Sequence, residues 1–377
     1  MIKINKNYKI KYNIVVLLIL LFFISITTLY SLCIYNNQFD ILKKQIIWYL
    51  IGFSLVFLLS KINCKKIVNH SFILYIFINI ILLLLLFISP NINGSKCWLI
   101  IPGIGSFQPS EFAKIILILV NTKLFEILSK KYPKRNILDD IKITFIVILF
   151  TLILSILTFL EPDTGMVIIY FLISFIMLFM FGIKKRIFIS IFLFLFTFVA
   201  IFLYFYFYQQ DSFINIFGTS FFYRIDRLLD WSNKDGMQLN NAIAAIKAAG
   251  LFGFGIGKTP IYIPEAHTDF IFSVFSSNFG FIGTMILLIL LFLFDYSLIK
   301  LLKDTKEKNC KFIIIGFLSM IIYQQIQNIS MNIGLLPITG ITLPFISYGG
   351  SSLISYFLCI SIILNYDYDK KIKPLIK

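Results

Sequence analysis

The sequence contains few charged residues for its length. Only 14% of its 377 residues are charged, whereas a soluble globular domain carries about 25%. Acids are especially scarce, with 18 Asp and Glu against 34 Lys and Arg, and 59% of the chain is hydrophobic. That composition leaves too little polar surface for an ordinary soluble protein. It predicts an all-α polytopic membrane protein.

Histidine and cysteine are also scarce. The chain has two His and five scattered Cys, and none of the Cys form a C-x-x-C pair. These numbers indicate neither a zinc site nor a disulfide framework. The net charge of +16 comes from short Lys and Arg clusters between apolar runs, which do not form a continuous basic face. We therefore expect membrane lipids as partners, and no nucleic acid.

Ten stretches are candidates for membrane-spanning helices, because a helix needs about 20 residues to cross a hydrocarbon core of about 30 Å. The stretch 111–128 contains four charged residues and is predicted from the orientation of its neighbours. The first stretch is too long for the core of a cleaved signal peptide and is read as an uncleaved span. The predicted spans are 14–35, 45–61, 71–89, 111–128, 141–160, 165–182, 187–208, 270–297, 312–333 and 344–365.

The distribution of cations predicts the orientation, since short loops rich in Lys and Arg stay in the cytoplasm. With both termini inside, the cytoplasmic segments carry 24 cations and the outer segments carry 8. Five of the outer cations fall in the long loop 209–268, which is long enough to escape this rule. We expect this loop to be the main extracytoplasmic element of a single domain, residues 1–377.

Three acids each stand at the outer start of a predicted span. Glu111 lies in QPSE, Asp163 in EPDTG and Asp269 in PEAHTD. Ionisable groups are costly at membrane depth, so their retention favours a functional cluster. Proline followed by an acid in the first turn is also how helices begin, and helix capping explains each residue taken alone. Both readings stay open.

Other cations have two readings as well. Lys114 stands one turn after Glu111 and could form an ion pair with it or contact a substrate. Arg224 and Arg227 in the long outer loop could bind a phosphate group. Interleaved aspartates in the same loop could equally neutralise both arginines.

Two further patterns favour close packing. Amides in 327–332 and small residues in 347–352, which include Ser351, would let neighbouring helices approach and hydrogen-bond. The glycines of 250–257 follow no predicted strand, which argues against a dinucleotide-binding loop. They favour tight turns or a close backbone approach.

Five segments together resemble, in order and spacing, the signature segments of the SEDS family, the RodA/FtsW-type proteins of bacterial elongation, division and sporulation. The similarity extends from about residue 10 to 365. The segments are QPSEFAK (108–114), EPDTG (161–165), GLFGFGIG (250–257), PEAHTDFIF (264–272) and MNIGLLPITGITLPFISYGGSS (331–352).

The resemblance implies a peptidoglycan glycosyltransferase that polymerises lipid II at the outer face of the bacterial cytoplasmic membrane. It implies that Asp269 is the general base and that a class B penicillin-binding protein is the partner. The sequence requires no cofactor, although Asp269 could hold Mg²⁺ or Mn²⁺ together with a pyrophosphate. The substrate-binding residues expected on this basis are Glu111, Lys114, Asp163, Arg224, Arg227, His267 and Ser351.

The chain departs from the family pattern in two places. Ser276-Ser277-Asn278 replaces a stretch in which family members usually carry a pair of acids, and Lys96-Cys97 stands in a usually more basic segment. Short termini and the segment KQIIWYLIGF favour the elongation branch. The alternatives are a division or sporulation protein, a lipid II flippase, or a scaffold that has lost catalysis.

Overall fold

The computed structural model describes residues 6–90, 95–101, 105–219, 222 and 237–366. Within these ranges, eight helices are long and apolar enough to cross a membrane, and the predicted polytopic all-helical fold is confirmed. They are α1 (Lys6–Asn36), α2 (Asp40–Leu59), α4 (Ser71–Ile88), α6 (Ile137–Leu160), α7 (Thr164–Phe181), α8 (Lys185–Tyr208), α12 (Ile271–Asp304) and α13 (Lys308–Asn332).

Two more helices occupy the remaining predicted spans. α5 (Pro109–Lys131) carries too many charges for the hydropathy criterion, and α14 (Gly350–Asn365) has only 16 residues. The predicted last span, 344–365, begins six residues too early, because 344–349 belongs to a loop that lines the cavity described below. A two-stranded antiparallel hairpin, β1 (Leu99–Ile101) and β2 (Gly105–Phe107), was not expected.

The helices begin where the sequence supplies start signals. Asn136 caps α6 in a reciprocal capping box with Asp139, which satisfies two backbone donors that have no partner within the helix. Pro109 opens α5, where a missing N–H costs nothing. The Asp163 side chain caps α7, so the helix-capping role considered for this acid is observed.

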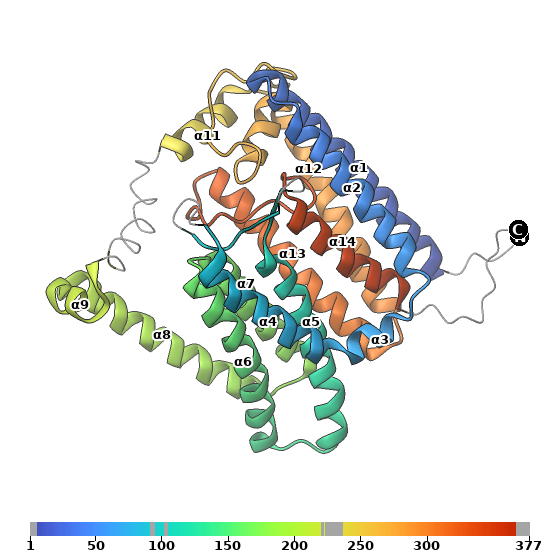
Figure 1. Cartoon of the computed structure of the whole chain (residues 1–377), viewed down its shortest axis with the longest axis vertical. Coiled ribbons are helices and arrows are strands. Elements are labelled where there is room, and N and C mark those ends of the chain that lie inside the picture. Colours follow the sequence, from blue (N-terminus) through green and yellow to red (C-terminus); the bar gives the residue numbers. More distant parts are fainter. Residues whose placement is uncertain (1–5, 91–94, 102–104, 220–221, 223–236, 367–377) are drawn as a thin grey trace, which may run out of the picture.

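One end of the bundle brings together the ends of several helices and is rich in cations. Lys11 Nζ near the start of α1 donates to Leu364 O at the end of α14 over 2.6 Å, so these helix ends lie together (Figure 1). The short helix α3 (Cys64–Asn69) lies at the same end. Lys65 Nζ of α3 is 2.7 Å from Glu307 Oε1, which belongs to the connection between α12 and α13. This end is rich in cations, and we call it the basic end.

α13 lies in the interior of the bundle, where it packs against α5, α7, α12 and α14. Of its most apolar window, 72% is buried inside the protein, although its mean hydropathy is only 1.5. The amide side chains of the helix lower its mean hydropathy. Exposing these polar groups to lipid would cost free energy. Burial between other helices lets the amides find protein partners.

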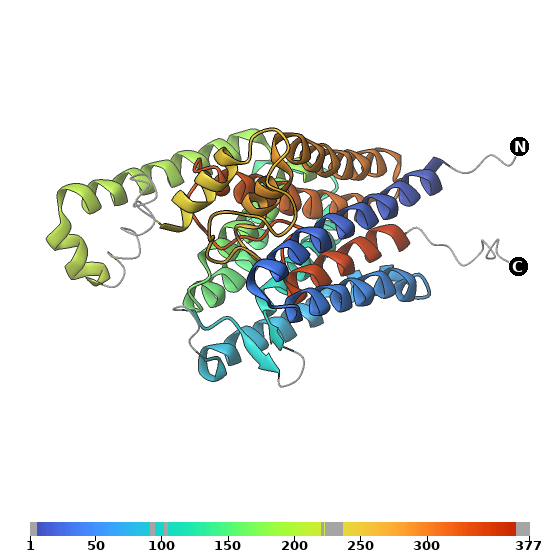
Figure 2. The same ribbon diagram turned by 90° about the horizontal axis from the view of Figure 1, so that it is seen from above.

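α8 has the opposite environment, because none of its apolar window is buried against protein. Both views show α8 leading away from the other helices into the short helix α9 (Gln210–Phe217) (Figures 1 and 2). Its apolar composition suits contact with lipid on all sides. Beyond the undescribed part of the long loop, the chain forms the helix α11 (Met237–Ala248).

The glycine-rich segment 250–257 packs onto a kink in α12. Phe254 N donates to Ser277 O over 2.9 Å, and Gly255 N donates to Asn278 O over 2.9 Å. The kink centres on Gly280, whose φ is 65°. A Cβ on Gly253 would lie 2.4 Å from the carbonyl carbon of Asn278. The predicted close backbone approach is therefore confirmed.

Candidate functional site

A cavity of about 570 Å³ lies at the N-terminal ends of α5, α7, α12 and α14, opposite the basic end. Five of the predicted site residues line it, although they come from four separate parts of the chain. They are Glu111, Asp163, His267, Asp269 and Ser351. The structure thus brings the three acids to one place, as their positions at helix starts predicted.

Glu111 is buried in the first turn of α5, where its carboxylate forms an ion pair with Lys114. Lys114 Nζ also lies 4.6 Å from the ring centre of Tyr356 on α14. Lys114 has no exposed surface and is absent from the lining of the cavity. The intrahelical ion pair is therefore the interaction seen for Lys114, and a contact with substrate stays a prediction.

The carboxylate of Asp163 links the start of α7 to the start of α5. Its Oδ1 accepts from Met166 N over 3.3 Å, and its Oδ2 accepts from Gln108 Nε2 over 2.8 Å and from Ser110 Oγ over 3.3 Å. Burial raises the pKa of Asp163 to about 6, because the charged form loses water. Most of its acceptor capacity is already used within the protein.

Ser351 and His267 also hold the walls of the cavity together. Ser351 Oγ on α14 accepts from Gln108 N over 3.0 Å. His267 O accepts from Tyr348 N over 2.8 Å, and the two rings lie 5.6 Å apart. Burial lowers the pKa of His267 below its usual value, so its imidazole is neutral at pH 7.

Asp269 differs from the other two acids. Its carboxylate accepts no hydrogen bond from the part of the chain that the structure describes, and it faces the cavity. Gly340, with φ of 69°, turns beside it: a Cβ there would lie 3.9 Å from Asp269 Oδ2. Burial, and secondarily the charge of Glu265, raises the pKa of Asp269 to about 6. The group is therefore ionised at neutral pH and is free to accept a proton.

Two amides of α13 hold the backbone of Asp269 in place. Asn328 Nδ2 and Asn332 Nδ2 each donate to Asp269 O over 2.9 Å. Asn332 Oδ1 accepts from Ser273 N over 3.1 Å and from Ser273 Oγ over 2.6 Å, which fixes the first turn of α12. These amides were predicted only to pack, and their spacing of four residues on one helix was the available signal for a shared target.

Glu161, two residues before Asp163, was also not predicted as part of this site. Its side chain is fully buried, and neither carboxylate oxygen has a hydrogen-bond partner among the described residues. Burial, together with the nearby charge of Asp163, raises the pKa of Glu161 to about 8. Glu161 is thus mainly protonated at pH 7, which removes one negative charge from the neighbourhood of Asp163.

The cavity contains carboxylates without facing cations. No Lys or Arg lines it within the described ranges, and no group of three His, Cys, Asp or Glu in those ranges could hold a metal ion. Arg224 and Arg227, predicted to bind phosphate, lie outside the described residues. Ser277 and Asn278 stand where family members usually carry acids. Both side chains are buried at the α12 kink and do not line the cavity.

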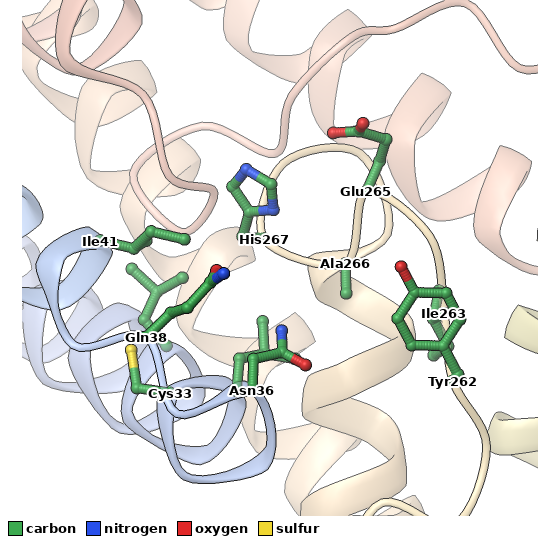
Figure 3. Close-up of a pocket in the computed structure, with 11 residues that line it drawn as sticks. Cys33, Asn36, Gln38, Ile41, Tyr262, Ile263, Glu265, Ala266 and His267 are labelled. Atoms are coloured by element: carbon green, nitrogen blue, oxygen red, sulfur yellow. The ribbon is translucent and has the colours of Figure 1, made fainter. Parts of the chain in front are cut away.

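A smaller cavity of about 180 Å³ lies on the other side of the segment that carries His267 (Figure 3). Glu265 and His267 line both cavities, so this segment separates them. Asn36 and Gln38, from the turn between α1 and α2, face it across the smaller cavity. The turn between α1 and α2 therefore lies across the smaller cavity from the segment that leads to Asp269.

Known proteins resemble this chain over most of its length. The family described as "Cell cycle protein" (FTSW_RODA_SPOVE) matches residues 6–372. The protein named "Probable peptidoglycan glycosyltransferase FtsW" of Wigglesworthia glossinidia brevipalpis is 31% identical over 362 residues, which cover 91% of this chain and 88% of that protein. "Stage V sporulation protein E" of Bacillus subtilis is 30% identical over 352 residues, which cover 88% of each chain.

Two solved structures share the fold. A chain from "Structural coordination of polymerization and crosslinking by a peptidoglycan synthase complex" is 25% identical, with a TM-score of 0.74 and coverage of 94% of this chain and 96% of that one. The rod shape determining protein RodA of Thermus thermophilus is 26% identical, with a TM-score of 0.67 and coverage of 94% and 95%. Division and sporulation proteins are among these relatives, so the similarity does not specifically favour the elongation branch.

Proposed function

Since this chain belongs to the FtsW/RodA/SpoVE family of cell cycle proteins, we propose that it is a peptidoglycan glycosyltransferase that polymerises lipid II. Its many apolar helices make it a multi-pass integral membrane protein. The proposed location is the bacterial cytoplasmic membrane, with the acid-lined cavity facing outward. The names of its relatives support this activity.

The observation that carries the proposal is the carboxylate of Asp269, which accepts no hydrogen bond from the described residues and lines the cavity. A general base needs an ionised group within reach of the acceptor hydroxyl, and a pKa near or below the working pH. Asp269 meets these requirements, because it lines a cavity of about 570 Å³ and has a pKa of about 6. Cavities of about 300–1,000 Å³ are typical of small-molecule sites.

The proposed reaction is an inverting glycosyl transfer. Asp269 accepts the proton of the 4-hydroxyl of an acceptor GlcNAc, and the oxygen attacks C1 of the donor MurNAc. The bond from C1 to the undecaprenyl pyrophosphate breaks, and its electron pair leaves with the pyrophosphate. The new β-1,4 bond extends the glycan, and the proton stays on Asp269 until solvent removes it.

The leaving pyrophosphate needs positive charge, which the described lining of the cavity does not provide. We assign this task to Arg224 and Arg227, because guanidinium groups bind phosphate in a bidentate manner. A divalent cation held by Asp269 and the pyrophosphate is the other candidate. Glu111, Asp163, His267 and Ser351 are assigned to substrate binding or to shaping its site.

Transport of lipid II without chemistry is the competing function. A flippase must expose a polar path to both leaflets, and the polar cavity lies at one end of this bundle. Between that cavity and the basic end, α5 buries apolar side chains in the interior of the bundle, including Leu117, Ile118 and Val120. This arrangement favours polymerisation.

The branch within the family is a finer question. The relatives named FtsW and the sporulation protein support a role in division or sporulation, whereas the segment KQIIWYLIGF favours elongation. A class B penicillin-binding protein is the proposed partner in each case, supported by the likeness to a chain of a peptidoglycan synthase complex. Depletion in the native bacterium separates the branches: filaments indicate division, and round cells indicate elongation.

The activity is tested with purified protein in detergent micelles, alone and with the cognate class B penicillin-binding protein. Labelled lipid II should be converted to long glycan strands that a muramidase degrades. Detergent removes the bilayer, so a flippase would yield no product. Absence of strands in the presence of a folded partner would contradict the proposed function.

A further inference from the structure

A groove of about 1150 Å³ lies at the basic end, between the C-terminal ends of α5 and α7 and the connection from α12 to α13. It is far from the acid-lined cavity, since it lies at the opposite ends of the same helices. Glycosyl transfer makes no use of it. The six cations that line it are Lys130, Arg135, Lys303, Lys306, Lys308 and Lys311.

The floor of the groove is aromatic and aliphatic. Phe125 and Phe181 stack with ring centres 4.3 Å apart and an interplanar angle of 11°. Phe312 lies 5.0 Å from Phe125 and 5.9 Å from Phe181, ring centre to ring centre. Met180 also lines the groove and is 50% exposed. The groove thus combines an apolar floor with a cationic rim.

The charges of this rim are not balanced within the described protein. The two acids in the groove are already paired, Glu126 with Lys123 and Lys130, and Glu307 with Lys65. Arg135 lies 3.9 Å from Asp140 Oδ1. Over the ranges that the structure covers, the lysines at 303, 306, 308 and 311 form no ion pair with a carboxylate. Four positive charges therefore surround an apolar floor.

We propose that this groove binds an anionic phospholipid of the surrounding bilayer. Its phosphate would lie among Lys306, Lys308 and Lys311, and an acyl chain would lie along Met180 and the phenylalanine floor. A zwitterionic lipid carries its own cation and would leave the lysines unbalanced. Basic pockets between membrane helices on the cytoplasmic side are suited to anionic headgroups, and the cation count places this end in the cytoplasmic leaflet.

The simpler explanation is that these lysines only follow the charge rule for cytoplasmic loops. That rule explains why cations gather at this end, but it predicts no preference for cations beside an apolar groove. Lys66, Lys142 and Lys185 offer a comparison, because they are exposed at the same end and do not line the groove. Removing three charges from either set changes the net charge equally.

The test is native mass spectrometry of the full chain in detergent, titrated with phosphatidylglycerol or with phosphatidylcholine of identical acyl chains. We expect phosphatidylglycerol to bind at least about tenfold more tightly. The variant K306Q/K308Q/K311Q should lose most of this preference, and the control K66Q/K142Q/K185Q should keep affinity within about twofold of the original. Thermal unfolding and lipid II polymerisation, measured on each variant, verify that the fold is intact.

Three results would overturn the proposal. Equal binding of the two lipids would show ordinary lipid contact. Equal losses in the two triple variants would show a general effect of surface charge. Displacement of the lipid by millimolar inorganic phosphate would identify a site for a soluble anion.

Discussion

The three carboxyl groups that share the outer cavity differ in their partners. Glu111 is paired with Lys114, and Asp163 accepts hydrogen bonds from three donors. Asp269 has an unpartnered carboxylate among the described residues. A group already engaged by the protein is a poor proton acceptor, so the local contacts assign the role of base to Asp269.

The raised pKa of Asp269 leads to a prediction about pH. Because the base must be ionised, kcat/KM should increase as the pH rises through about 6. The substitution Glu265→Gln removes a negative charge that raises this pKa, so the rising limb should move to lower pH. Rates of lipid II polymerisation between pH 4.5 and 8, taken as about the usable range, measure this shift.

His267 is the alternative origin of such a limb. Burial lowers its pKa from the usual value, and loss of a proton from its imidazole would also change the rate with pH. A His267→Gln variant that loses the limb, while its rate at pH 8 stays normal, would reassign the limb to the imidazole. Retention of the limb in that variant supports Asp269.

The sequence was sufficient to locate the three acids, because proline and acid at a helix start are local signals. It could not decide whether Lys114 faces substrate or Glu111, since that depends on Tyr356, 242 residues away. The same holds for the amides that bind Asp269 O from 59 and 63 residues away. Contacts of this kind arise only when distant helices are packed together.

At the scale of single elements, the start of α12 is fixed by α13. The substitution Asn332→Ala removes hydrogen bonds to Asp269 O and to Ser273, so Asp269 should lose its position. A misplacement of about 1 Å can cost about a hundredfold in rate. We expect kcat to fall at least about tenfold with KM little changed, measured by steady-state polymerisation of lipid II.

Gln325→Ala is the matched control on the same helix, because Gln325 Nε2 donates to Asp295 Oδ1 and is not part of the cavity lining. Its kcat should stay near that of the original protein. Equal losses in both variants, or an effect on KM alone, would show that Asn332 has no positioning role.

The glycine segment offers a paired test of the α12 kink. Gly253 and Gly255 both have positive φ, but a Cβ at Gly253 would overlap Asn278, whereas a Cβ at Gly255 meets nothing within 4 Å. Both alanine variants incur the left-handed backbone cost of about 1–2 kcal/mol. Gly253→Ala should in addition displace α12, so its thermal unfolding midpoint should lie several degrees below that of Gly255→Ala. Equal midpoints would contradict the close packing of this segment on α12.

Hydropathy was a good guide to most elements and a poor one at two places. Nine of the ten spans could be predicted because their apolar runs are long, whereas 111–128 was predicted from the orientation of its neighbours. The start of α14 was wrong because 344–349 is nearly as apolar as the helix, yet it is a loop that lines the cavity. The hairpin of β1 and β2 has three residues in each strand, too few to give an alternating pattern that the sequence could reveal.

At the scale of the whole molecule, we expect the acid-lined cavity and the basic groove to open on opposite sides of the membrane. Glu265→Cys and Lys306→Cys place reactive thiols at these two ends, while all five native cysteines are buried. A membrane-impermeant maleimide should label Glu265→Cys in intact cells and Lys306→Cys only after lysis. The reverse pattern would invert the predicted orientation.

The most direct measurement of the central claim compares Asp269→Asn with Asp40→Asn in the lipid II polymerisation assay. Asp40 starts α2, and its side chain is 87% exposed outside the cavity. We predict that Asp269→Asn loses at least about a hundredfold in rate, that Asp40→Asn keeps the original rate, and that both unfold at the original temperature. Normal polymerisation by a folded Asp269→Asn protein would contradict the assignment of Asp269 as the base.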